Sequence, residues 1–134
     1  MPENVEIVRA GFEHFISTGD LQDDIMTPDF VWDMSQFEGW PEESIYPGPE
    51  GTRAFLRAWT EPWEDWQLQL ESMHGAGDRV VAVVRQSGRS AVGGMTVEMN
   101  FAMVWTLRDG KQARMVMYSD PAEAFAAVGL DYPA

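Results

Sequence analysis

Four segments typical of β-strands follow one another between residues 66 and 119, and only short turns separate them. The segments 66–73, 79–86, 95–107 and 113–119 alternate apolar with polar residues or are rich in valine, as strands with one buried face are. The turns between them contain Gly75 and Gly77, Ser87 and Gly88, and Asp109 and Gly110. Because these residues favour hairpin turns, the sequence predicts an antiparallel meander of four strands.

Helical and extended patterns precede this meander. Apolar residues at helical spacing predict a first helix over residues 3–17, and a short second helix is expected over residues 20–26. An aromatic and β-branched run then predicts a strand over residues 30–34. The next stretch, 35–50, is rich in proline, glycine and acidic residues without periodicity, and is predicted to be a long loop.

Two further helices are predicted on either side of the meander. One covers residues 49–61, and the other covers residues 121–128, where Asp120 can cap the helix and Pro121 can be its first residue. Helices followed by a meander indicate a single α+β domain over residues 1–134, with the helices stacked on one face of a curved antiparallel sheet. A sheet that wraps around a helix leaves a conical hollow.

The charge balance excludes one large class of partner. The chain of 134 residues has 22 acidic and 9 basic residues, for a net charge of −13, so it lacks the basic surface that nucleic acid requires. It has no cysteine, so neither a disulfide nor a thiolate metal site is expected. The absence of a long apolar stretch or a signal-peptide pattern leads us to expect a cytoplasmic protein that does not bind membranes.

Several short motifs, in this order and spacing, resemble the SnoaL-like branch of the nuclear transport factor 2-like superfamily. They are Thr18-Gly19-Asp20, Val31-Trp32-Asp33, Tyr46-x-Gly48-x-x-Gly51, the run from Gly77 to Val81, the run from Val104 to Lys111, and Tyr118-x-Asp120-x-Ala122-Glu123-Ala124 with Gly129-Leu130. The resemblance implies a cone-shaped α+β barrel that is usually dimeric through its outer sheet face. It also implies a small-molecule pocket at the wide end, but no single activity, because the superfamily includes isomerases, cyclases, hydrolases and members without known chemistry.

Asp33 is the leading candidate for a catalytic residue. It has the apolar neighbours Trp32 and Met34, and burial would raise the pKa of its carboxyl toward the range useful for a general base. The resemblance places it where ketosteroid isomerase has its proton-transferring aspartate, an enzyme that is a standard example of pKa tuning. The alternative is an aspartate that caps a turn at the end of the strand.

The same resemblance also shows what this chain lacks. The two positions that donate hydrogen bonds to the oxyanion in the isomerase correspond here to Phe12 and Met103, which have no suitable donor. One carboxylate of the epoxide-hydrolase relay corresponds to Met117. Neither mechanism is therefore expected in its known form.

The two histidines do not have the spacing of a metal site, and we expect neither a metal nor a cofactor. His14, on the first helix, is a second catalytic candidate, because it could border the pocket and shuttle a proton. His74 precedes Gly75 and is interpreted as a turn residue.

The inner face of the sheet is expected to line a pocket for a small apolar molecule. Methionines and aromatic rings alternate along the last two strands, and family spacing places them inside. The predicted pocket residues are Phe12, Phe15, Trp32, Tyr46, Trp59, Trp63, Met99, Phe101, Met103, Met115 and Met117. The same residues could instead simply fill the core.

The opposite face of the sheet is predicted to form a homodimer interface. Ala102, Val104 and Val116 would be unusually apolar for a surface in contact with water, and Arg85 is expected to pair with Glu98 on the neighbouring strand. Three functions stay open: an isomerase-, cyclase- or hydrolase-type enzyme with Asp33 as its base, a non-catalytic binding protein, and a purely structural dimer. Catalysis would need a second polar group beside Asp33, from His14, Tyr46 or Trp32.

Overall fold

The computed structural model describes residues 4–38, 40, 44–90 and 94–131. Its helices are α1 (Asn4–Thr18), α2 (Gly48–Thr60) and α3 (Pro121–Ala127), with a short 3₁₀ turn, η1, at Asp23–Ile25. Its strands are β1 (Met26–Asp33), β2 (Ile45–Pro47), β3 (Trp63–Ala76), β4 (Arg79–Ser90), β5 (Thr96–Arg108) and β6 (Lys111–Tyr118). None of the helices among these residues is long and apolar enough to span a bilayer.

The predicted meander is confirmed, but the sheet around it is mixed and open. Its strand order is β2-β1-β6-β5-β4-β3, with antiparallel pairing throughout β3–β6. β1 pairs with β6 in parallel, so the prediction of an entirely antiparallel sheet is wrong. The parallel pairing arises because the chain leaves β1, crosses through α2 and the meander, and returns beside β1 in the same direction. The described edge strands β2 and β3 do not pair with each other.

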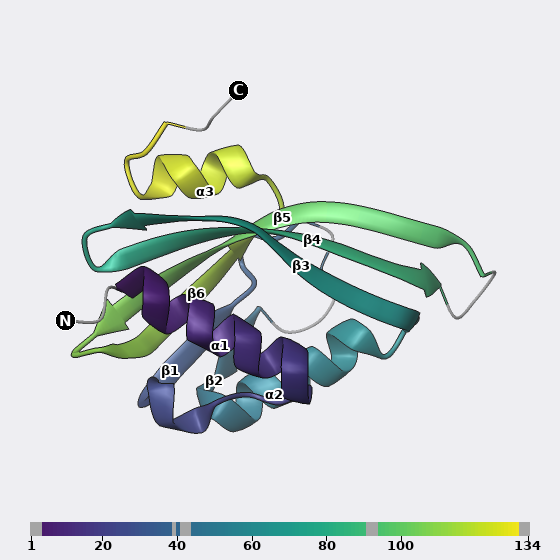
Figure 1. The fold of residues 1–134 in the computed structure, drawn as a ribbon, viewed down its shortest axis with the longest axis horizontal. Helices are drawn as coiled ribbons and strands as arrows, with labels where there is room; N and C mark the ends of the chain where they lie inside the picture. The colour runs from purple at the N-terminus through teal and green to yellow at the C-terminus, as the bar shows by residue number, and fades with distance from the viewer. Residues whose placement is uncertain (1–3, 39, 41–43, 91–93, 132–134) are drawn as a thin grey trace.

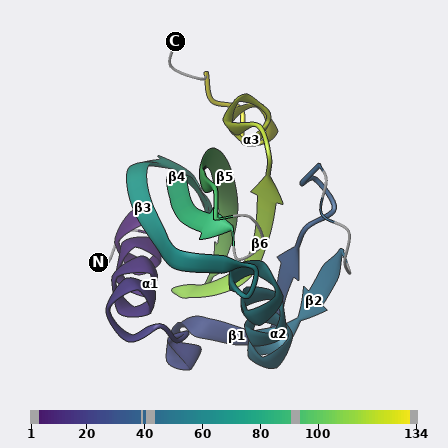
Figure 2. The same ribbon diagram turned by 90° about the vertical axis from the view of Figure 1, so that its right-hand side faces the viewer.

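The helices lie on both faces of the sheet rather than on one. α1 and α2 lie under the concave face, whereas α3 lies on the opposite, convex face (Figure 1, Figure 2). On the concave side the core is dominated by aromatic and methionine side chains, and Phe30, Phe55, Phe101, Met115 and Met117 are fully buried there. The sheet therefore separates a large inner core from a small outer one.

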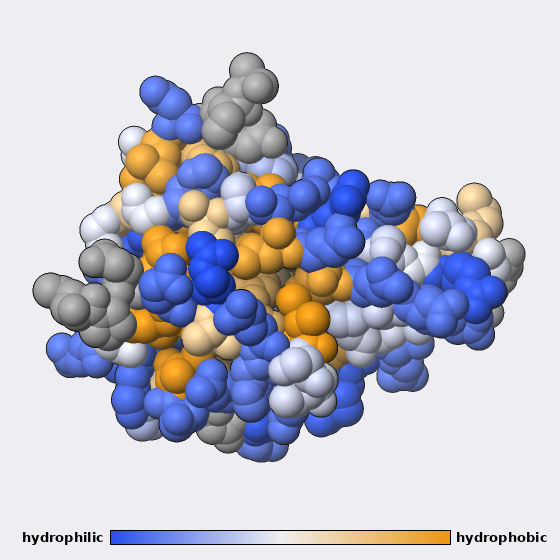
Figure 3. Space-filling view, viewed as in Figure 1, coloured by the Kyte–Doolittle hydropathy of each residue, from blue (hydrophilic) through white to orange (hydrophobic). Residues whose placement is uncertain are grey.

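The outer core covers two of the three apolar residues on which the predicted dimer interface rests, Ala102 and Val104. Ala102 and Val104 are buried within the chain, against Ala124 and Phe125 of α3. Asp120 accepts a hydrogen bond from the Ala122 backbone N–H, 2.9 Å away, and so caps α3 as predicted. Space-filling spheres show apolar side chains between α3 and the sheet, whereas hydrophilic ones dominate the protruding ends of the long strands (Figure 3).

The uncovered part of the outer face is polar. There Arg85 lies between Glu71, at 3.6 Å, and Glu98, at 3.9 Å, which confirms the predicted pairing with Glu98. Both carboxylates and the guanidinium are well exposed, so these ion pairs contribute little to stability.

Two local predictions before the meander need correction. The second helix is only the 3₁₀ turn η1, and β1 begins at Met26 rather than at Phe30. Pro28 is tolerated within β1 because the pairing with β6 is interrupted between Met26 and Val31. The predicted loop over residues 35–50 contains the short strand β2, which pairs with the end of β1; residues 39 and 41–43 of that loop lie outside the described residues.

Candidate functional site

A small cavity lies between the concave face of the sheet and the helices α1 and α2. Its volume is about 60 Å³, less than half of the roughly 150 Å³ in which an engineered apolar cavity admits benzene. Seven of the predicted pocket residues line it, namely Phe12, Phe15, Trp32, Trp59, Phe101, Met103 and Met117. Sheet alternation explains why Phe101, Met103 and Met117 share the cavity face, because residues two apart on β5 and β6 face the same side.

The other four predicted pocket residues lie elsewhere. Trp63 and Met99 line a wide, open surface groove next to the cavity, which also contains Phe37 and Trp40. Tyr46 and Met115 are buried in the inner core, where the Tyr46 hydroxyl accepts a hydrogen bond from the Trp40 indole N–H at 3.2 Å. For these two, the packing alternative fits the structure better than the pocket prediction.

The cavity wall is apolar and uncharged over its described residues. Its polar groups are the amides of Gln22 and Gln112, the Thr52 hydroxyl and several indole N–H groups. Thr52 donates its hydroxyl proton to the Gly48 carbonyl at 2.9 Å, so it is occupied within α2. None of the described lining residues has an ionisable side chain.

The indole N–H groups differ in whether the protein provides an acceptor. Trp59 donates to the Gln86 side-chain oxygen at 2.5 Å, whereas the Trp66 and Trp105 N–H groups are buried without a partner in the described structure. Sequence reasoning did not select Trp66 or Trp105 as site residues. The alternation through Phe101 and Met103 places Trp105 on the inner face, but an unpaired donor can be recognised only from the packed structure.

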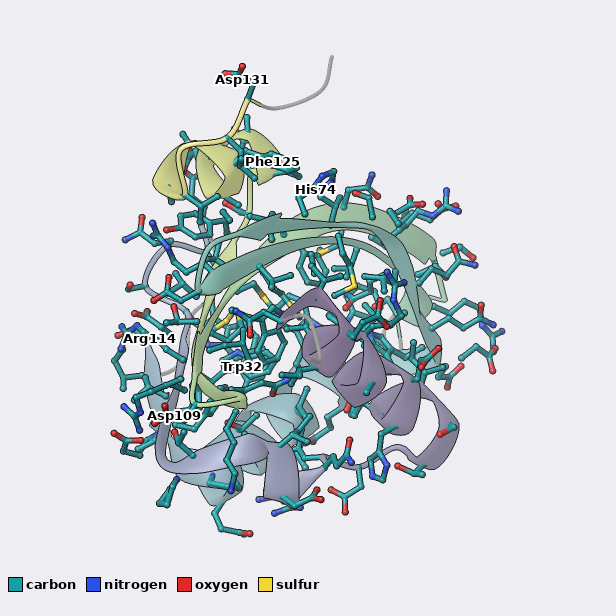
Figure 4. All side chains as sticks on the ribbon, turned by 60° about the vertical axis from the view of Figure 1, so that its left-hand side comes forward. Trp32, His74, Asp109, Arg114, Phe125 and Asp131 are labelled. Atoms are coloured by element: carbon teal, nitrogen blue, oxygen red, sulfur yellow. The ribbon has the colours of Figure 1, made fainter. Side chains whose placement is uncertain are left out.

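Asp33 does not point into the cavity. It follows the inward-facing Trp32 on β1, so its side chain lies on the outer face of the sheet, where it forms an ion pair with Arg114 of β6. The Ser35 backbone N–H donates a second hydrogen bond to its carboxylate at 2.8 Å. Trp32 lies under the sheet and Arg114 projects from it on the other side (Figure 4).

The electrostatics of Asp33 are those of a structural carboxylate. Burial raises the pKa of this carboxyl. The hydrogen bonds from Ser35 lower it, and so do the positive charge of Arg114 and its hydrogen bond. The lowering effects outweigh burial, so the pKa lies below its ordinary value. The prediction of a raised pKa is therefore wrong. Burial and the nearby Asp33 charge also raise the pKa of Tyr118 on the same face.

Neither histidine lies against the cavity. The His14 side chain is half-exposed on α1 and is not among the residues that line the cavity. His74 is part of β3, not of a turn, and its ring packs on Phe125 of α3 at 4.8 Å (Figure 4). The described residues contain no group of three side chains positioned to bind a metal ion.

Comparisons with solved structures identify the class of fold. An NTF2-like protein from Burkholderia thailandensis matches with a TM-score of 0.74 and 26% identity, over 96% of this chain and 98% of that one. TerC, co-crystallised with polyporic acid, matches with a TM-score of 0.71 and 25% identity, over 93% and 96%. A SnoaL-like polyketide cyclase, so described provisionally, from Jannaschia sp. CCS1 has a TM-score of 0.68 at 23% identity, over 98% and 93%.

These neighbours and the observed layers define an NTF2-like fold. The family model of the SnoaL-like domain matches residues 8–115, and the chain belongs to that family. The family resemblance of the sequence is thereby confirmed. No curated protein matches the chain.

Proposed function

We propose that this protein binds a small, largely apolar molecule in the cavity between α1, α2 and the inner face of the sheet. The observation that carries this proposal is an interior cavity lined by aromatic, methionine and aliphatic side chains with a few uncharged polar groups. Such a composition is typical of small-molecule sites. TerC, whose fold is similar, was crystallised with a small molecule, polyporic acid.

Binding without acid–base chemistry at Asp33 is favoured over catalysis. A general base must reach the proton it removes, but the Asp33 carboxylate lies on the far side of the sheet from the cavity and is paired with Arg114. The described lining offers no other ionisable group. A cyclase- or isomerase-type reaction would therefore need polarisation by uncharged donors alone.

Ligand entry requires some side chains to move, because about 60 Å³ holds few atoms. Met103 and Met117 are suited to such movement, since a thioether chain is unbranched and adapts to irregular shapes. The expected ligand is therefore small, and a larger one should be admitted only by displacement of these side chains.

Filling the cavity is expected to weaken binding. Leu68 and Leu70 share the inner face of β3 and are both half-buried, but only Leu68 lines the cavity. Leu68→Phe should weaken the binding of methylenecyclopentane, a small apolar probe, by about tenfold or more, because the larger ring occupies the space the probe needs. The measurement is a titration followed by the methyl signals of Met103 and Met117, which line the cavity, in NMR.

Leu70→Phe is the matched control, and it should bind the probe like the unaltered protein. Equal weakening by both substitutions would indicate a general loss of packing rather than an occupied site. If neither methylenecyclopentane nor cyclopentanone binds the unaltered protein, the cavity is merely a packing defect and the proposal is wrong.

A further inference from the structure

Two tryptophans that line the cavity have a buried indole N–H without an acceptor. Trp105 on β5 is only 7% exposed, and its indole N–H has no partner in the described structure. Trp66 on β3 is partly buried, and its N–H is also buried without a partner. Both side chains line the cavity. Buried polar groups almost always find a partner, so each exception needs an explanation.

The surroundings of these two rings explain why the protein itself leaves them unpaired. Trp105 packs edge-on against Phe12, at 5.9 Å, and against Trp32, at 6.1 Å. Trp66 packs edge-on against Phe15 at 6.0 Å. Aromatic neighbours hold the indoles in place but offer only weak π acceptors.

Three other tryptophans have an acceptor for their indole N–H within the protein. The N–H groups of Trp32, Trp40 and Trp59 meet the Met34 sulfur, the Tyr46 hydroxyl and the Gln86 amide oxygen, respectively. Among the described residues, the buried indole N–H groups without a partner are thus those of two tryptophans that line the same cavity. This coincidence points to an acceptor that arrives with the ligand.

We propose that the cavity selects neutral carbonyl compounds, such as small ketones, in which the oxygen accepts a hydrogen bond from the indole N–H of Trp105 or Trp66. This inference rests on the proposed function and adds the chemical class of the ligand. A carbonyl oxygen only accepts hydrogen bonds, and it therefore matches a wall whose tryptophans have buried N–H groups without an acceptor. The rest of the molecule is apolar, like the wall.

The charge of the site excludes an anionic acceptor from the proposal. No described lining residue is cationic, and the chain has a net charge of −13. A carboxylate would lose its hydration on entering this cavity without gaining a counter-ion, which is far costlier than burying a neutral carbonyl. The protein's own field would also repel it during approach.

A matched pair of probes tests the selection. Cyclopentanone and methylenecyclopentane have the same ring and differ only in an exocyclic oxygen against an exocyclic CH₂ group. A hydrocarbon leaves both N–H groups unpaired, whereas the ketone can form one hydrogen bond. The two affinities are first corrected for the different free energies of transfer of the two probes out of water. After this correction the ketone should bind about tenfold more tightly. The indole N–H proton signal of Trp105 or Trp66 should move downfield with the ketone only.

Substitutions that delete one N–H while keeping an aromatic ring identify the donor. Trp105→Phe and Trp66→Phe should reduce the preference for the ketone, at least one of them to near unity. Trp40→Phe is the control: Trp40 is not among the residues that line the cavity, and its N–H donates to the Tyr46 hydroxyl, so the preference should persist.

The outcomes separate this inference from the proposed function. If both probes bind with equal corrected affinity and neither N–H signal responds to the ketone, the site is a general apolar one and the carbonyl inference is wrong. A preference that survives in both Trp105→Phe and Trp66→Phe would also overturn it. Failure of both probes to bind would refute the proposed function itself.

Discussion

Val104→Glu is expected to cost about 3–5 kcal/mol of folding free energy, because it places an unpaired carboxylate under α3. Val104 is 4% exposed on β5 and packs against α3 within its own chain. A carboxylate there would be buried without a cation, and the main relief would be for α3 to separate from the sheet. Since small domains are stable by only about 5–15 kcal/mol, much of the margin would be lost.

Thr106→Glu is the matched control for this substitution. Thr106 lies two residues farther along β5 on the same face, and its cross-strand partners are Arg79 and Arg114. A glutamate at this half-buried position gains nearby cations, so the free energy of unfolding should change by less than about 0.5 kcal/mol. Urea unfolding followed by tryptophan fluorescence measures both variants.

Sedimentation of the same samples tests the homodimer, which stays a prediction. The sequence-based interface would make Val104→Glu dissociate the protein while leaving the fold stable. The covering of Val104 by α3 leads to the opposite expectation: a large loss of stability, whatever the state of association. A folded variant with unchanged urea midpoint would contradict the role we assign to α3.

The sequence predicted the meander well because its information is local. Each alternating run and each glycine-containing turn from residue 66 to residue 119 lies within a few residues of its partner, and hairpin pairing follows from that proximity. The position of α3 depends instead on which face of the finished sheet remains to be covered. Ala102 and Val104 signal only that this face is apolar, and an intramolecular helix satisfies that signal as well as a partner subunit does.

The same distinction explains the results at the site. Alternation correctly placed Phe101, Met103 and Met117 on the cavity wall, since a strand has only two faces. It equally requires Asp33 to point away from Trp32, but the family resemblance had favoured a position in the pocket. The acceptor-free environment of Trp105 could not be predicted, because it depends on rings from α1, β1 and β5 that meet only after folding.

The last prediction concerns Arg114, whose removal leaves Asp33 as a buried carboxylate without its cation. Asp33 is 5% exposed, whereas the Arg114 side chain is 44% exposed, so the aspartate bears most of the desolvation. Arg114→Met keeps an apolar stem and deletes the charge. We expect a loss of about 1–3 kcal/mol in the free energy of unfolding at neutral pH.

Arg108→Met is the matched control. Arg108 pairs at 2.7 Å with Asp29, which lies on β1 like Asp33, but both side chains of this pair are well exposed. Exposed pairs contribute little, so this variant should lose less than about 1 kcal/mol. Equal losses in the two variants would show that burial of Asp33 does not determine the strength of its pair.

The contribution of the Asp33–Arg114 ion pair to the free energy of unfolding should depend on pH. Because the folded-state pKa of Asp33 lies below its ordinary value, the pair stabilises the fold above the unfolded-state pKa, and this contribution is lost as pH falls through the folded-state pKa. The difference in free energy of unfolding between Arg114→Met and the unaltered protein should therefore be greatest near neutrality and shrink in acid, where the Asp33 carboxyl is protonated in both.

NMR titration of the Asp33 carboxyl should give a midpoint below the ordinary value in the unaltered protein and a higher one in Arg114→Met. A midpoint above the ordinary value in the unaltered protein would restore the physical argument for Asp33 as a general base and would count against a stabilising ion pair between Asp33 and Arg114.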